Sequence, residues 1–271
     1  MANQLSTYPK LQFAFNYLRY YLQAANGKGH GIHSPFVFEF ITKILNDKSE
    51  YADYKKIEEL RRTLLHDKKV VTVEDLGAGS SSFKSNRRSI ASIARVAVKG
   101  AKYAQLLYRI IRYYQPQHIL ELGTSLGVTT AYLSSANSDA NVFTLEGAAE
   151  IAQVAKRNFQ QLELKNVKLV EGNFDYTLPA ILHQLPRVDF AFIDGNHRHD
   201  PTLNYFIQIV SKVDNNSTFV FDDIHWSKEM EVAWNKIKEH PRVACTIDLF
   251  FIGVVFFRQQ FKEKQHFTIR F

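Results

Sequence analysis

The segment from His118 to Thr130, HILELGTSLGVTT, constrains the fold more than any other part of this chain. Apolar residues typical of a buried strand lead to a carboxylate, Glu121, and a glycine turn then runs into a helix opened by Thr129 and Thr130. A strand that passes through glycines into a helix N-terminus is how doubly wound α/β folds build a nucleotide pocket. The spacing is E-x-G-x-x-x-G and not G-x-G-x-x-G, which disfavours binding of a dinucleotide pyrophosphate.

Strand and helix patterns alternate from this segment toward the C-terminus, which predicts a mostly parallel sheet covered on both faces. Four of five expected strands end in acids, and ligands of such sheets gather at the carboxyl ends of the strands. These acids are Glu121, Glu146, Asp194 and the pair Asp222–Asp223. The fold class that we expect is α/β, with a doubly wound, mostly parallel seven-stranded sheet. Its last strands, from VACTIDL and GVVFFR, should pair antiparallel, and HFTIRF is a candidate edge strand.

The first part of the chain differs in pattern, so we expect an N-terminal helical extension or cap over residues 1–98 and the main domain over 99–271. Apolar residues at helical spacing predict helices near residues 9–25, 35–46 and 51–66. The DLGAGS segment, residues 75–80, looks like a second nucleotide-binding turn, but no strand with a terminal acid follows it. We therefore interpret it as a structured loop, followed by a basic helical segment.

A second apolar strand, VFTLEG, ends in Glu146, which lies 25 residues after Glu121. An acid at this place can accept hydrogen bonds from both ribose hydroxyls of a nucleoside. Together the two elements resemble the class I S-adenosylmethionine (SAM) methyltransferases, which have a Rossmann-like fold. The resemblance implies that the glycine turn cradles the methionine part of SAM and that Glu146 holds its ribose. The implied cofactor-binding residues are Glu121, Gly123, Thr124, Ser125, Gly127, Thr129, Glu146, Gly172, Asn173 and Asp194.

Asp194, Asp222 and Asp223 should converge because they close neighbouring strands. Like charges so close together require a raised pKa or a bound cation. Oxygen ligands alone favour Mg²⁺ or Ca²⁺, with Mg²⁺ preferred at a site that engages substrate oxygens. The alternative is that one aspartate meets the SAM ammonium while the others cap helices or form ion pairs. His197 follows Asp194 by three residues and is a candidate general base; His199 and His225 are further candidates.

These residues sharpen the resemblance toward metal-dependent O-methyltransferases of the catechol and macrolide-sugar types. An acid after the fourth strand, a histidine three residues later and an Asp-Asp pair after the fifth match the macrolide-sugar type. The similarity implies that Asp194, Asp222 and Asp223 bind the metal and that His197, with Asp194, is catalytic. No motif in the first hundred residues matches either type, so the acceptor cannot be carried over.

Composition is that of an ordinary globular protein, with 45% hydrophobic and 23% charged residues. A single cysteine, Cys245, rules out an internal disulfide and is consistent with a reducing compartment, so we expect a cytoplasmic protein. The longest apolar run, 249–257, is too short to span a bilayer, and we expect no membrane partner. The net charge of +7 is scattered, and nucleic acid is not expected; a homodimer is left open.

The function predicted from these features is SAM-dependent, Mg²⁺-assisted methylation of a hydroxyl on a small molecule. A metal-independent N- or O-methyltransferase on the same fold is the main alternative. A nucleic-acid methyltransferase is disfavoured because no N/D-P-P-Y/F signature is present. A SAM-binding module without catalysis is disfavoured by the three aspartates.

Overall fold

The computed structural model describes residues 7–73, 86–98 and 100–271. Their contacts group into two compact units. The first unit joins the chain up to Asp47 with Arg187–Phe271, and the second is Lys48–Pro186. The predicted boundary between residues 98 and 99 lies inside the second unit, and a separate role for the segment before it stays a prediction.

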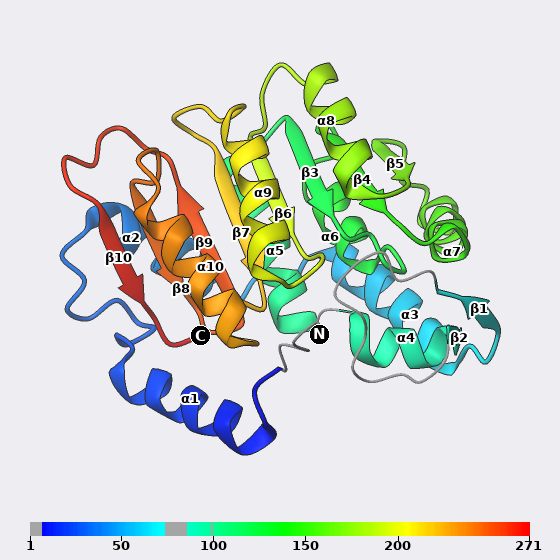
Figure 1. Cartoon of the computed structure of the whole chain (residues 1–271), viewed down its shortest axis with the longest axis horizontal. Coiled ribbons are helices and arrows are strands. Elements are labelled where there is room, and N and C mark those ends of the chain that lie inside the picture. The colour runs from blue at the N-terminus through cyan, green and yellow to red at the C-terminus, as the bar shows by residue number, and fades with distance from the viewer. Residues whose placement is uncertain (1–6, 74–85, 99) are drawn as a thin grey trace, which may run out of the picture. The chain divides into compact units, whose positions relative to one another are not determined.

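The second unit is built around three parallel strands in the order β3-β4-β5 (Figure 1). They are β3 His118–Leu122, β4 Asn141–Glu146 and β5 Val167–Glu171. Four helices alternate with them: α5 Ala101–Tyr114, α6 Val128–Ala136, α7 Ala149–Gln161 and α8 Phe174–Gln184. Consecutive residues of β3 from Ile119 onward are fully buried, although successive side chains of a strand point to opposite faces. Both faces of this strand are therefore covered, as predicted.

A small antiparallel pair and two helices precede α5 in the same unit. The pair joins β1 Val70–Thr72 to β2 Arg87–Ser89, and the helices are α3 Ala52–His66 and α4 Ile90–Ala97. The basic segment after DLGAGS, which was expected to be helical, is extended at β2, where its backbone pairs with β1. The Ser89 hydroxyl then accepts the backbone N–H of Ser92 at 3.2 Å and caps α4. The DLGAGS segment lies outside the described residues.

The first unit contains five strands among its described residues, in the order β10-β8-β9-β7-β6 (Figure 1). Strands β6 Phe190–Ile193 and β7 Thr218–Asp222 are parallel. The strand β9 Ile252–Phe256 runs antiparallel to β7 and to β8 Cys245–Asp248, which confirms the predicted terminal pair. The strand β10 Gln265–Thr268 lies parallel to β8 at the edge and confirms the extra strand expected from HFTIRF.

Helices of the first unit come from both ends of its sequence. They are α1 Lys10–Gln23, α2 Pro35–Phe40, its continuation η1 Ile41–Leu45, α9 His199–Val210 and α10 Lys228–Glu239. Phe40 is buried and its ring packs edge-on against Phe256 of β9 at a centroid distance of 5.6 Å. Over the described ranges, we find no helix with the length and apolar character needed to cross a bilayer.

Candidate functional site

The turn between β3 and α6 has three residues in the left-handed backbone region: Gly123 at φ 101°, Ser125 at φ 48° and Gly127 at φ 79°. The backbone N–H of Gly123 donates to the carbonyl of Leu145 at 3.0 Å, which ties the turn to the end of β4. A Cβ atom at Gly127 would lie 2.5 Å from the Phe159 ring of α7. Glycine is therefore required at residue 127 both by the backbone angle and by the close packing of α7.

Glu121 is fully buried beneath this turn and joins three elements through hydroxyl groups. Its Oε2 accepts hydrogen bonds from Thr130 of α6 at 2.5 Å and from Thr144 of β4 at 2.6 Å. The Thr144 hydroxyl also lies 2.5 Å from that of Thr124. Burial raises the pKa of Glu121 to about 7, although the two threonine hydrogen bonds oppose the shift. The other oxygen, Oε1, is buried and has no hydrogen-bond partner among the described residues.

Glu146 ends β4 beside the same turn. Its Oε2 accepts the backbone N–H of Ser125 at 2.8 Å, and its Oε1 accepts that of Ala148 at 2.9 Å. Burial raises the pKa of this carboxyl group, and the backbone hydrogen bonds act in the opposite direction. Because a carboxylate offers about four lone-pair sites, Glu146 retains acceptor capacity for a ligand.

Gly172 and Asn173 follow β5, the third strand of this unit. Gly172 has a φ of 130° and donates its N–H to the Glu146 carbonyl at 2.9 Å. The Asn173 Oδ1 accepts the backbone N–H of Asp175 at 2.8 Å and caps α8. The cap uses one lone pair of the side-chain oxygen, and the amide NH₂ is a donor that a ligand could accept. Thr129 is buried in the first turn of α6.

The second unit thus brings the ends of its three strands together around one turn. The residues predicted to hold a cofactor that lie there are Glu121, Gly123, Thr124, Ser125, Gly127, Thr129, Glu146, Gly172 and Asn173. Two buried polar atoms of this group, Glu121 Oε1 and Ser125 Oγ, have no partner among the described residues. Buried polar groups are normally hydrogen-bonded, so these atoms and the glycine turn fit a polar ligand such as SAM. Sequence reasoning missed Thr144, since a threonine in mid-strand carries no special signal.

In the first unit, Asp194 follows β6 directly and its Oδ1 lies 3.4 Å from the Nε2 atom of His197. The loop between them is shaped by Asn196, which has a φ of 63° and donates its side-chain amide to the Tyr205 hydroxyl of α9 at 3.3 Å. His199, another candidate from the sequence, pairs with the exposed Asp200 at 2.6 Å. The structure therefore pairs His197, and not His199, with the aspartate at the strand end.

Asp222 and Asp223 leave β7 in different environments. Asp222 is the last residue of the strand and is buried, whereas Asp223 has a φ of 54° and donates its N–H to the Phe251 carbonyl at 2.7 Å. Among the described residues, no three His, Cys, Asp or Glu side chains are grouped closely enough to hold a metal ion. As placed here, Asp194, Asp222 and Asp223 do not form the preformed ligand set that the sequence suggested.

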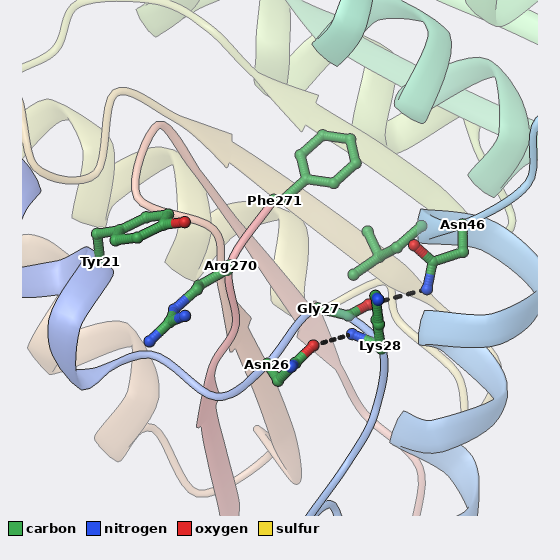
Figure 2. Close-up of a pocket in the computed structure, with 8 residues that line it drawn as sticks. Tyr21, Asn26, Gly27, Lys28, Asn46, Arg270 and Phe271 are labelled. Atoms are coloured by element: carbon green, nitrogen blue, oxygen red, sulfur yellow. Dashed lines mark hydrogen bonds between the residues drawn. The ribbon is translucent and has the colours of Figure 1, made fainter.

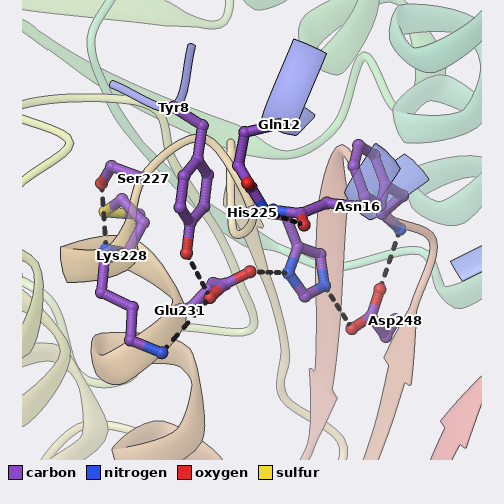
Figure 3. Close-up of polar contacts among 10 residues, drawn as sticks. Tyr8, Gln12, Asn16, His225, Ser227, Lys228, Glu231 and Asp248 are labelled. Atoms are coloured by element: carbon purple, nitrogen blue, oxygen red, sulfur yellow. Dashed lines mark hydrogen bonds and ion pairs between the residues drawn. The ribbon is translucent and has the colours of Figure 1, made fainter. Parts of the chain in front are cut away.

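His225 lies between two carboxylates on neighbouring elements (Figure 3). Its Nε2 is 2.8 Å from Asp248 of β8, its Nδ1 is 3.3 Å from Glu231 of α10, and its ring stacks on Phe250. Burial lowers the pKa of His225, but the hydrogen bonds to Asp248 and Glu231 outweigh it and raise the pKa to about 9. These two carboxylates favour the protonated form of His225, which makes it a poorer candidate for a general base than His197.

Comparison with known proteins gives a family match over residues 120–224, to the family described as a methyltransferase domain. An uncharacterized protein of Acanthamoeba polyphaga mimivirus, R132, is 36% identical over 69 residues, which are 24% of this chain. The matched stretch covers 31% of that relative, so the chain spans less than a third of its length.

Solved structures share the fold. The SAH-bound Podospora anserina methyltransferase PaMTH1 superposes with a TM-score of 0.59 at 15% identity, over 94% of this chain and 99% of that one. The O-methyltransferase from Bacillus cereus in complex with SAH gives 0.51 at 16% identity, over 82% and 97%. TomG, a Streptomyces achromogenes O-methyltransferase in complex with SAM, gives 0.54 at 14% identity, over 78% and 91%. These structures confirm the predicted Rossmann-like methyltransferase fold, and residues 120–224 match a methyltransferase domain.

Proposed function

We propose that this protein transfers the methyl group of SAM to a hydroxyl of a small molecule. The observation that carries the proposal is the Glu146 carboxylate, which backbone N–H groups hold at the end of β4, beside the glycine turn. The similar O-methyltransferases from Bacillus cereus, with bound SAH, and TomG, with bound SAM, support the choice of cofactor and of a hydroxyl acceptor.

The second unit supplies the groups that would hold SAM. Glu146 would accept the ribose hydroxyls with its remaining lone pairs. The N–H of Ser125 fixes that carboxylate in place, so the side chain need not be ordered again on binding. Glu121, whose burial raises its pKa to about 7, would supply negative charge near the ammonium group only when it is ionised. SAM itself supplies an activated methyl group on a sulfonium, so the protein mainly has to position and deprotonate the acceptor.

The first unit supplies the candidate base. His197 would take the acceptor proton, and Asp194 at 3.4 Å would orient the imidazole and stabilise its charged form. The products of this step are a methyl ether, SAH and protonated His197. His197 then passes its proton to water. No part of this step needs a metal ion.

The reaction could also be assisted by Mg²⁺ bound to Asp194, Asp222 and Asp223, although the described residues do not group these side chains as ligands. Addition of a chelator distinguishes a metal-assisted reaction from a metal-independent one. Loss of turnover in excess chelator, restored by Mg²⁺, would establish the metal-assisted form, whereas full turnover would establish the metal-independent form.

The cofactor assignment is tested by calorimetric titration of SAH into the Glu146→Ala variant. Loss of a charged acceptor for two hydroxyls is worth about 2–4 kcal/mol, so affinity should fall roughly 30- to 700-fold. Glu171→Ala is the matched control, because Glu171 lies beside Glu146 in register but is exposed and paired with Lys156. Its affinity should stay within about twofold of the wild-type value. Equal affinity of both variants and wild type would argue against the site.

Turnover is tested by measuring SAH released from SAM with a panel of hydroxylated small molecules. His197→Ala should lower turnover by about 10²- to 10⁴-fold, the usual range for loss of a general base, without changing SAH affinity. His199→Ala is the control because His199 pairs with exposed Asp200 and not with Asp194. If the two variants lose turnover equally, His197 is not the base.

A further inference from the structure

The helix α1 has one face packed on aromatic side chains of its own unit. Phe13, Tyr17 and Tyr20 lie with their ring centroids 5.3, 5.0 and 5.2 Å from that of Phe250. The Tyr20 hydroxyl also donates a hydrogen bond to the backbone carbonyl of Ile269. This face is therefore fixed to the protein.

The opposite face of α1 is also apolar, but it is open to solvent. Leu11, Phe15, Leu18 and Leu22 have exposed fractions of 87%, 62%, 54% and 69%. Their spacing of four, three and four residues places them in one stripe along the helix. Each of the first three precedes a packed residue by two positions, which is about 200° around an α-helix. α1 is thus apolar on two opposite sides, and its own unit covers one of them.

Charges around the open stripe are all positive within the helix. Residues 10–23 contain Lys10 and Arg19 and no aspartate or glutamate. At the C-terminal end of α1, the Arg270 guanidinium lies 4.6 Å from the centroid of the Tyr21 ring. Figure 2 shows Tyr21 and Arg270 with Lys28 in the lining of a cavity of about 450 Å³. The helix therefore carries only positive side-chain charges, and Arg270 and Lys28 add two more cationic groups near its C-terminal end.

A second copy of the chain fits this face poorly. α1 is 14 residues long, which is about 21 Å, whereas each partner of a stable dimer contributes about 800 Å². Four side chains on a helix of this length fall short of that area. Two such helices would also bring lysines and arginines together without any acid on the helix to pair with them.

An anionic lipid surface fits both properties. Helices that lie in a membrane interface bury Leu and Phe side chains among the lipids and carry Lys and Arg beside them. Each such cation gains from the negative surface potential of anionic phospholipids. We propose that α1 docks the protein on an anionic membrane surface through Leu11, Phe15, Leu18 and Leu22. The expectation of no membrane partner rested on the lack of a spanning segment, and a helix lying on the surface needs none.

The test is co-sedimentation of the full chain with vesicles of equal parts phosphatidylglycerol and phosphatidylcholine, and with phosphatidylcholine alone. Wild-type protein should bind the anionic vesicles and bind the neutral ones far more weakly. Phe15→Ser/Leu18→Ser should reduce binding more than tenfold, because two buried apolar side chains are lost. Arg19→Gln should reduce it about fivefold, the effect of one cation near the surface. Ile207→Ser is the matched control because Ile207 is 57% exposed on α9, and its binding should be unchanged.

Three results would overturn the proposal. The first is no binding of the wild type to anionic vesicles. The second is binding that the Phe15→Ser/Leu18→Ser variant retains in full, which would assign it to the general positive charge. The third is self-association in analytical ultracentrifugation that this variant abolishes while vesicle binding is absent, which would assign the stripe to a second copy. Circular dichroism of each variant checks that the helix content is unchanged.

Discussion

Replacement of Gly127 by alanine isolates the packing that shapes the candidate cofactor turn. Gly127 and Gly31 share the same backbone angle, φ 79°, but their surroundings differ. A Cβ atom at Gly127 would lie 2.5 Å from Cε1 and 2.9 Å from Cζ of Phe159, whereas a Cβ atom at Gly31 would meet nothing within 4 Å. Gly31→Ala therefore adds only the backbone strain of placing alanine in the left-handed region. Gly127→Ala adds the same strain and also a steric clash with Phe159.

The strain costs about 1–2 kcal/mol for each variant. Overpacking against Phe159 adds about 1–3 kcal/mol. We expect Gly127→Ala to lower the free energy of unfolding by about 2–5 kcal/mol and Gly31→Ala by about 1–2 kcal/mol. In a Phe159→Leu background, which removes the two ring atoms closest to the added Cβ, the cost of Gly127→Ala should approach that of Gly31→Ala.

Urea unfolding followed by circular dichroism measures these free energies, and the double-mutant cycle gives the coupling between Gly127 and Phe159. The reasoning is refuted if Gly31→Ala and Gly127→Ala cost the same, or if Phe159→Leu gives no relief. Because the measurement is made without cofactor, it separates packing of the turn from its proposed role in binding SAM.

Other predictions concern the first unit. Because the folded-state pKa of His225 is raised from 6.5 to about 9, its stabilising effect is complete below about pH 6.5 and is lost as the pH rises to 9. The loss of unfolding free energy over this range is at most about 3 kcal/mol. In the His225→Gln variant, the free energy of unfolding in urea should depend less on pH over this range. An unchanged pH dependence would contradict the ion pairs with Glu231 and Asp248. Gly253→Ala should cost about 1–3 kcal/mol because its Cβ would lie 2.6 Å from the Trp234 ring, and Trp234→Phe should recover part of it in thermal unfolding.

Local patterns in the sequence predicted the elements that carry the cofactor turn. The helix expected after the glycine turn is α6, which begins directly after left-handed Gly127. Glu146 ends β4 as expected, since a buried strand of apolar residues must stop where a carboxylate meets a turn. Such features depend on neighbours within a few residues and are visible in the sequence.

These local patterns could not predict how distant segments pair. Arg87–Ser89 has no strand signal of its own and is extended because β1 provides hydrogen-bond partners. The strand before Asp194 is limited to Phe190–Ile193, where it pairs with β7. Asn173 was assigned to a ligand, although its position before a helix also indicates a cap, and the cap uses one lone pair of its oxygen.

Tertiary structure determines the hydrogen-bond partners and the protonation of the polar side chains. The sequence alone placed acids at the strand ends, because period and turn residues determine where strands stop. It could not show that Glu121 would accept hydrogen bonds from Thr130 and Thr144, or that Glu231 and Asp248 would flank His225 and raise its pKa. The protonation of a buried group depends on burial and on partners brought from remote parts of the chain, and only the folded structure supplies both.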